Sequence, residues 1–518
     1  MSKLTLKIEA LAQKGLKSTI FSGERQLGRP TTISPAMAAD VRELGQRFRG
    51  LFEGTIPLVR SENLRQFGQR LRDVFFTPVW EKCERSSGRL LIVSADREML
   101  TLPWELIELN EGTPLGCDTA WSLRRTSVES FVPPVALIRG PLRVLFMTAC
   151  PVDQELAEIE REEDIVLEAT AHADLRIHFA ERGSIDELAA LVTKHRPHLV
   201  HLSGQCGMDD QESAIFAFED ERGRTDWQKP KDLYAKVLRD KSVRCLLLNA
   251  RWSPSDSIVA FCQALLDCRT PYAIGWPLSP ADERASGFLR TFYGEAAKGT
   301  SITNVVALAR NSLREAGKFV GPRGEVQDPV FALPQVYCSV ESGELFDSSR
   351  RADSPEFDQV PEDGHQHALL GSIPVLRFGF IDRRREYQRL LRALREGDAT
   401  VGAITGIQGV GKSVLATKVA TRLQQAGFEV VTVSTKEGPI PSANARSTLD
   451  AIDRALGDVF ARQPNRDMYT LLNRQEMTRR QRLQIMTQGL NELRVIVLID
   501  KFEQVDRMLG ARSARREQ

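Results

Sequence analysis

The sequence predicts an α/β protein in which a large, mainly parallel sheet flanked by helices is followed by a smaller α/β domain. Apolar strands and amphipathic helices alternate regularly between residues 142 and 316, a pattern typical of a parallel sheet with helices on both faces. A glycine-rich loop then lies between an apolar segment, 401–405, and a helical one. A further apolar run, 494–499, ends at Asp500 and completes the pattern expected for the second domain.

The length of 518 residues suggests roughly two to four domains. Residues 1–80 form an N-terminal extension of one strand and two helices, expected to pack on a large domain at 81–345. Residues 346–376 are rich in Ser, Pro and acidic residues and poor in apolar ones, which is typical of a flexible linker. Residues 377–518 form the last domain.

Within these boundaries the hydrophobic periodicity predicts individual elements. The expected strands are 4–8, 89–94, 143–148, 175–179, 199–203, 215–219, 245–249 and 272–276. The expected helices are 36–52, 61–76, 156–171, 185–195, 230–240, 256–267, 281–298, 303–316 and 383–394.

The glycine-rich loop has the spacing that binds a nucleotide triphosphate. Gly406, Gly409 and Gly411 allow a tight turn whose N–H groups point at phosphate oxygens, and the following helix adds its positive N-terminal end. Lys412 can reach the outer phosphates, and the hydroxyl of Ser413 can bind Mg²⁺. A glycine-rich turn that matches by chance is the alternative. The strand expected before it and the helix after it favour the phosphate loop.

The strand predicted at 494–499 supplies the carboxylates that such a site requires. Asp500 follows the strand directly and is a candidate ligand for Mg²⁺ through water. Glu503, three residues on, could polarise the attacking water. Many strands end in Asp, so this pair carries weight only together with the loop upstream. The expected cofactors are ATP and Mg²⁺.

Charge and cysteine usage exclude several classes of protein. The net charge is only +1, although residues 377–518 hold 25 Lys and Arg against 16 Asp and Glu. This basic excess lacks interleaved aromatic residues, so solvated helix faces explain it better than nucleic-acid binding. The eight cysteines show no C-x-x-C pair or zinc spacing. No signal peptide or membrane-length apolar run is present, so we expect a cytoplasmic protein.

Residues 377–503 resemble the nucleotide-binding domain of the STAND class of P-loop NTPases, the signalling ATPases of the NACHT and NB-ARC type. The resemblance rests on G-F-I-D-R-R-R-E at 379–386, on the loop G-I-Q-G-V-G-K-S at 406–413 and on the strand that ends at Asp500. It implies ATP and Mg²⁺ as cofactors and self-association through this domain. The family continues with a sensor residue, a fifth strand and a winged helix, whereas about 15 residues follow Glu503 here.

We therefore expect a partial P-loop NTPase domain. In the family order, a strand from the missing part lies between the strands expected at 401–405 and 494–499. Each of these would then have one unpaired edge. A nonfunctional fragment of a longer protein is one reading of such a chain.

Residues from about 50 to 345 resemble a CHAT domain, a caspase-like α/β fold. The matching segments are L-P-W-E-L at 102–106, H-L-V-H-L-S-G at 198–204, L-L-N-A at 247–250 and I-G-W-P at 274–277. Active members of this family have His-Gly after the first S-G and Cys after L-N-A. Gln205 and Arg251 stand in those places here. Gln cannot titrate and Arg is not a nucleophile, so the resemblance implies a peptidase that has lost its catalytic pair.

Two further residues are candidates to replace the lost catalytic pair. Cys206 adjoins Gln205 and could be the non-standard nucleophile of an active cysteine peptidase. It follows the strand expected at 199–203, however, whereas position 251 follows the strand expected at 245–249. His201 lies inside its predicted strand and is expected to be a core histidine. The alternative to peptidase activity is binding, in which a protein partner or peptide occupies the cleft and Arg251 offers a cation to a carboxylate.

Overall fold

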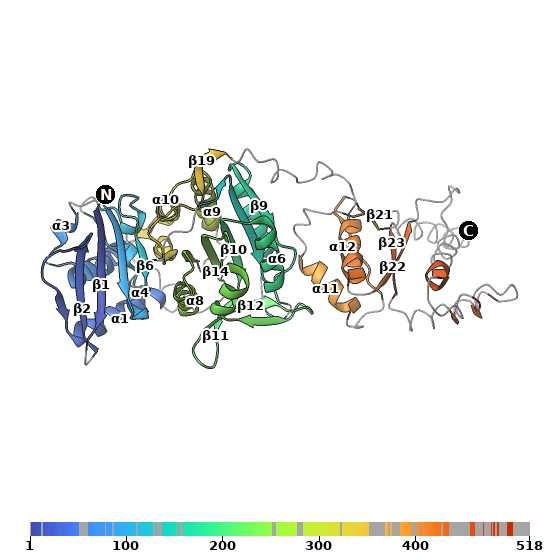
Figure 1. The fold of residues 1–518 in the computed structure, drawn as a ribbon, viewed down its shortest axis with the longest axis horizontal. Coiled ribbons are helices and arrows are strands. Elements are labelled where there is room, and N and C mark those ends of the chain that lie inside the picture. The colour runs from blue at the N-terminus through green and yellow to red at the C-terminus, as the bar shows by residue number, and fades with distance from the viewer. Residues whose placement is uncertain are drawn as a thin grey trace. The chain divides into compact units, whose positions relative to one another are not determined.

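The computed structural model divides the chain into two compact units, Met1–Asp353 and Ser354–Gln518 (Figure 1). Each is described by itself. The structure describes residues 2–11, 14–50, 61–77, 79–84, 88–109, 112–127, 131, 137–151, 153–154, 159–250, 255–276, 283–321, 324–351, 368–370, 373–375, 384–395, 401–407, 409–425, 428–434, 456–461, 470, 478, 480–481, 484–485 and 495–500.

A 12-stranded sheet organises the first unit, counted over the described residues. Its order is β3-β2-β1-β5-β6-β18-β15-β14-β10-β8-β9, with β4 on β2. Neighbours from β15 to β9 run parallel, whereas β18 is antiparallel to β15, so the prediction of a mainly parallel sheet flanked by helices is confirmed. The strands are β1 (Ser2–Ala10), β2 (Leu16–Ser22), β3 (Arg25–Gln26), β4 (Thr31–Ile33), β5 (Gly88–Ser94), β6 (Arg124–Thr126), β8 (Leu142–Thr148), β9 (Leu175–Phe179), β10 (Leu199–Gly204), β14 (Cys245–Ala250), β15 (Tyr272–Trp276) and β18 (Gln335–Cys338).

Helices cover both faces of this sheet, as the alternation of buried residues along its strands requires. Val200 and Leu202 of β10 lie in one core with α6 (Ile185–His195) and α8 (Ser255–Asp267). Leu199 lies in the other, with α5 (Ile159–Thr170), α9 (Glu283–Ala297) and α10 (Ile302–Ala316). The two cores bury the apolar residues of every central strand, and this leaves the strand ends to carry polar groups.

The first residues of the chain belong to the same sheet. β1 pairs parallel with β5, with Leu6 opposite Ile92. The helices of this part of the chain are α1 (Pro35–Gly50), α2 (Ser61–Phe75), α3 (Trp80–Glu84) and α4 (Arg97–Thr101). At the other end of the unit, Phe346 is buried and stacks on His198 at 5.6 Å. β19 (Asp347–Arg351) then pairs with β7 (Arg139–Gly140).

Two predicted elements of the first unit differ from the structure. The strand expected at 215–219 exists as β12 (Ala214–Glu219), but it belongs to a separate antiparallel sheet with β11 (Cys206–Met208) and β13 (Thr225–Gln228). A short turn closed by Asp209 precedes it, and so short a connection permits only antiparallel pairing. The helix expected at 230–240 is split into α7 (Pro230–Leu233) and a π-helical turn, Tyr234–Leu238.

The second unit contains a parallel pair of strands, β22 (Glu429–Ser434) and β23 (Val495–Asp500). Ile496 faces α12 (Lys412–Gln425), which packs against α11 (Arg384–Arg395), while Val431, Val495 and Val497 face Leu456, Val459 and Phe460. Burial on both faces explains the continuous apolar run before Asp500. A short hairpin, β20 (Ala368–Leu370) and β21 (Ile373–Val375), lies in the same unit.

The strand expected at 401–405 is wrong. Residues 401–406 have no strand assignment, and the side chain of Val401 is 81% exposed. Within the described part of the second unit, β23 pairs only with β22, a strand that the sequence prediction missed. An apolar segment becomes a strand only where a neighbouring strand shares its backbone hydrogen bonds, and no described residue does so here.

Candidate functional sites

The first candidate site lies where β10 and β14 end. The two strands run parallel with Gly204 opposite Ala250, so residues 205 and 251 continue from neighbouring positions at one edge of the sheet. Gln205 turns the chain into β11, and its carbonyl accepts the N–H of Ala217 at 2.9 Å. Among the described residues, its side-chain Oε1 is buried without a hydrogen-bond partner. Arg251 lies outside the described residues.

A buried row of polar side chains lies directly beneath this edge. Ser203 is opposite Thr148 on one side and Asn249 on the other, so the three share one face of the sheet. The carboxylate of Glu162, on α5, accepts the hydroxyl of Ser203 and the Nδ2 of Asn249, each at 2.5 Å. Glu162 thus joins the ends of both strands that lead to positions 205 and 251.

The sequence prediction missed Glu162, although its spacing carried a signal. Residues 162, 165, 166 and 169 recur at i, i+3, i+4 and i+7, and Ile165, Val166 and Ala169 are all buried. A glutamate on the apolar face of a helix is unfavourable unless donors meet it. Thr148 Oγ1 and Asn249 Oδ1, in contrast, are buried and have no hydrogen-bond partner within the part of the chain that the structure describes.

His201 is a buried core residue, in agreement with the prediction. Its side chain is 1% exposed, and Nδ1 lies 2.7 Å from the hydroxyl of Tyr293. Nε2 lies 3.9 Å from Glu162 Oε1. Burial, and then the nearby Glu162, raises the pKa of Tyr293 well above its usual value, so the phenol stays protonated.

Cys206 lacks the environment of a nucleophile. It is 1% exposed on β11, and burial raises the pKa of its thiol well above the usual value, with a smaller contribution from Cys262. A reactive cysteine requires an accessible thiolate stabilised by nearby positive charge. The thiol of Cys206 is instead a small apolar group in the core.

The second candidate site is the loop before α12. Gly409 and Gly411 have φ values of 85° and 87°, which L-residues rarely adopt, and no described atom outside the adjoining residues lies within 4 Å of a Cβ built on either. The loop therefore has the glycine-specific backbone of a tight phosphate-type turn, with open space beside these two residues. Lys412 Nζ donates to the carbonyls of Gly406 and Ile407, at 2.9 Å each, so it bends back over the loop.

The remaining residues of this site are only partly described. α12, which begins at Lys412 and contains Ser413, packs against β22 and β23. The backbone of Asp500 ends β23 opposite Ser434, so the strand that carries this carboxylate lies beside the helix that follows the loop. Glu503 and the side chain of Asp500 lie outside the described residues. The loop itself fits a phosphate group, because its glycines leave space and the start of α12 offers N–H groups.

Comparison with known families decides the identity of the first unit. A family model described as the CHAT domain matches residues 65–338, which is more than half of the chain. The chain belongs to the CHAT-domain family. A second model, described as an AAA domain, matches residues 395–514, so this CHAT-domain protein also carries a P-loop NTPase-type domain, as predicted. No curated protein matches the chain.

In the part of the chain that the structure describes, no helix is both long and apolar enough to cross a membrane. An AAA domain is a nucleotide-binding type, and the open loop before α12 is consistent with that class.

Proposed function

We propose that this CHAT-domain protein is a cytoplasmic, STAND-type signalling protein that binds ATP with Mg²⁺ and whose CHAT domain acts by binding rather than by cleavage. The open glycine loop before α12 is the observation that carries this function. Lys412 would contact the outer phosphates, Gly406, Gly409 and Gly411 would place N–H groups around them, and Ser413 and Asp500 would hold the metal ion. Glu503 would orient the attacking water. Bound ATP supplies the phosphoryl chemistry of the domain.

Nucleotide binding by the full chain tests the first half of the proposal. Lys412→Ala removes a charged contact to phosphate, so we expect ATP affinity, measured by calorimetry with Mg²⁺, to fall at least about tenfold. Lys418→Ala on the same helix is the matched control and should leave the affinity unchanged. Equal affinities for all three proteins would contradict the proposal. Self-association that increases with ATP, measured by light scattering, would extend it to assembly through the AAA domain.

The loss of peptidase activity is supported by the residues at the end of β10 and β14. Gln205 and Arg251 replace the His and Cys of active family members, and loss of either partner in a hydrolase costs on the order of 10⁴–10⁶ in rate. The buried, protonated Cys206 offers no substitute. We therefore expect a peptide library to remain uncleaved. Cleavage that a thiol alkylator abolishes would instead support an active cysteine peptidase.

Without peptidase activity, the CHAT domain would bind an acidic peptide at the ends of β10 and β14. Arg251 would pair with a carboxylate of the peptide. Arg251→Ala should then weaken binding of acidic peptides and leave neutral ones unaffected, as measured by fluorescence anisotropy. An unchanged affinity for acidic peptides would remove Arg251 from the site. The double change Gln205→His with Arg251→Cys asks whether cleavage returns when the catalytic pair is restored.

A further inference from the structure

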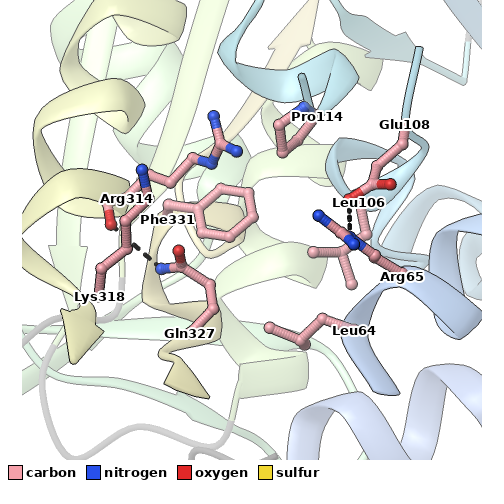
Figure 2. Close-up of a pocket in the computed structure, with 9 residues that line it drawn as sticks. All are labelled: Leu64, Arg65, Leu106, Glu108, Pro114, Arg314, Lys318, Gln327 and Phe331. Atoms are coloured by element: carbon pink, nitrogen blue, oxygen red, sulfur yellow. Dashed lines mark hydrogen bonds and ion pairs between the residues drawn. The ribbon is translucent and has the colours of Figure 1, made fainter. Parts of the chain in front are cut away.

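A cavity of about 120 Å³ lies in the first unit (Figure 2), and no residue of β10 or β14 lines it. Residues of α2, the end of α10 and the hairpin of β16 (Lys318–Gly321) and β17 (Gly324–Gln327) surround it, together with the segment after α4. Its lining is Leu64, Arg65, Leu106, Glu108, Pro114, Arg314, Lys318, Gln327 and Phe331.

The deeper lining of the cavity is apolar and buried. Leu64, Leu106 and Phe331 are 4%, 3% and 2% exposed, and Figure 2 shows the ring of Phe331 between Arg314 and Gln327. The side chain of Gln327 is held in place, because its Nε2 donates to the carbonyls of Arg314 and Asp328 at 3.1 and 3.0 Å. Buried apolar side chains therefore lie beneath the cavity, and its exposed lining combines polar and apolar atoms.

The rim of the cavity has more positive than negative charge. The lining contains three cations, Arg65, Arg314 and Lys318, and one carboxylate, Glu108. Glu108 already pairs with Arg65 at 3.1 Å, as the dashed line in Figure 2 shows. Lys318 pairs with Glu315, outside the lining, in an exposed i, i+3 contact that contributes little stability.

Arg314 differs from the other two cations in its pairing. Over the described residues, its guanidinium makes one hydrogen bond, at a long 3.4 Å, to the carbonyl of Gly112, and no ion pair, although it interacts electrostatically with the neighbouring Glu315. A guanidinium has five N–H donors in a plane, which suits bidentate contact with a carboxylate. Arg314 lies in the last turn of α10, where the helix dipole stabilises a positive charge. The dipole explains Arg314 alone and not the two other cations that line the same cavity.

We propose that this cavity binds a small organic anion in which a carboxylate is joined to a compact apolar group. The apolar group would lie on Leu64, Leu106 and Phe331, and the carboxylate would pair with Arg314, with Lys318 nearby. The volume is well below the roughly 300–1,000 Å³ of sites for drug-sized ligands, so the bound group is about the size of one amino-acid side chain.

The probe is 4-methylpentanoate, titrated into the full chain at low salt, with 4-methylpentanamide as the uncharged ligand of the same shape. Methyl NMR spectra of Leu64 and Leu106 report where the ligand lies, and their shifts give its affinity. We expect the carboxylate to shift both residues and to bind at least about tenfold more tightly than the amide, as a charge-assisted hydrogen bond predicts. A peptide ending in a leucine carboxylate forms a second arm. Tighter binding of this peptide would identify a chain terminus as the source.

Arg314→Met keeps the length of the side chain and removes its charge, and should weaken 4-methylpentanoate binding about tenfold. Arg290→Met is the matched control, because Arg290 is a surface arginine that pairs with Glu168 outside the cavity. If Arg314→Met folds poorly, Lys318→Gln, a substitution at an exposed residue, should still weaken 4-methylpentanoate binding several-fold. Equal binding of carboxylate and amide, no shift of Leu64 and Leu106, or affinities unaffected by both cavity variants would overturn the proposal. None of these results depends on nucleotide or on the ends of β10 and β14.

Discussion

Glu162 is the residue on which the arrangement at the end of β10 and β14 depends. A buried carboxylate is costly unless hydrogen bonds compensate for the loss of water, and Ser203 and Asn249 each donate to one of its oxygens. Ser203 lies two residues before position 205, and Asn249 lies two residues before position 251. The carboxylate therefore holds two strand ends in register with each other.

We expect Glu162→Ala to destabilise the first unit by about 3–5 kcal/mol, because it leaves two buried donors without an acceptor and opens a cavity. Hydrogen exchange of the β10 and β14 amides measures this loss in the full chain. Glu168→Ala, on the exposed side of the same helix, should change it by less than about 0.5 kcal/mol. Similar effects of the two substitutions would show that the bonds to Glu162 contribute little.

His198 makes the stability of the first unit depend on pH. Burial, and then Arg143, Arg244 and Arg196, lower the pKa of this imidazole to about 3, and its Nδ1 accepts the N–H of Arg143. The unfolded chain binds a proton near pH 6.5 and the folded chain does not. Stability is therefore lost as the pH falls below 6.5 toward 3.

From pH 7 to pH 5 this residue should lower the free energy of unfolding by about 2 kcal/mol. His195, whose pKa burial and then His178 and Lys194 lower to about 4, acts in the same direction. His198→Asn keeps an acceptor for Arg143 without titrating, so urea unfolding should show a shallower pH dependence. The exposed change His172→Asn should leave the wild-type slope. An unaltered slope in His198→Asn would rule out this assignment.

The buried ion pairs of Glu105 show that the L-P-W-E-L segment at 102–106 stabilises the fold. Its carboxylate accepts both terminal nitrogens of Arg125, at 2.7 and 2.6 Å, and Arg310 at 2.8 Å, and all three side chains are at most 1% exposed. The indole of Trp104 donates to the carbonyl of Met99 at 2.9 Å. The residue types were visible in the sequence, but their partners lie 20 and 205 positions away.

At the scale of elements, the loop before α12 combines a backbone conformation that glycine alone adopts readily with open space. The N–H of Leu415 donates to the carbonyl of Gly411 at 3.0 Å, so Gly411 caps the start of α12 while its φ is positive. A side chain at Gly411 would meet no atom within 4 Å, so any cost comes from the backbone. The strain should amount to roughly 1–2 kcal/mol for an L-residue.

Gly411→Ala should therefore weaken ATP binding about five- to thirtyfold, as the loop leaves the conformation that directs its N–H groups at phosphate. Calorimetry with the full chain measures the change. Gly457→Ala is the control, because Gly457 is helical, has an ordinary φ and also has open space around it. That substitution should preserve binding and slightly raise stability. Normal ATP affinity in Gly411→Ala would show that the positive φ is not required.

The element that the sequence failed to predict shows the limit of local patterns. V-G-A-I-T at 401–405 and E-V-V-T-V-S at 429–434 have similar apolar content, but only the second pairs with β23. Strand formation depends on a partner far away in the sequence, and periodicity contains no information about that partner. The same reason placed β12 outside the main sheet.

At the scale of the whole molecule, the first strands complete the sheet that carries the site. Leu4, Leu6 and Ile8 are at most 2% exposed, and β1 covers the edge of β5. Removing residues 1–34 should expose that edge and the apolar residues beneath it, and so cause aggregation, seen by size-exclusion chromatography with light scattering. Ending the chain after Asp353 keeps both cores of the first unit and should give a folded monomeric unit. A well-behaved protein without residues 1–34 would contradict this account.

The sequence alone determined the two kinds of α/β unit and the position of the glycine-rich loop, and its resemblance to CHAT domains predicts that Gln205 and Arg251 replace a His and Cys pair. The first two follow from periodicity and loop spacing, which are local properties. Only the tertiary structure decided that β1 and β5 share one sheet, that Glu162 joins two strand ends, and that three cations surround one small cavity. These contacts join segments far apart in the chain, and their free energy comes from burial and pairing that no single segment encodes.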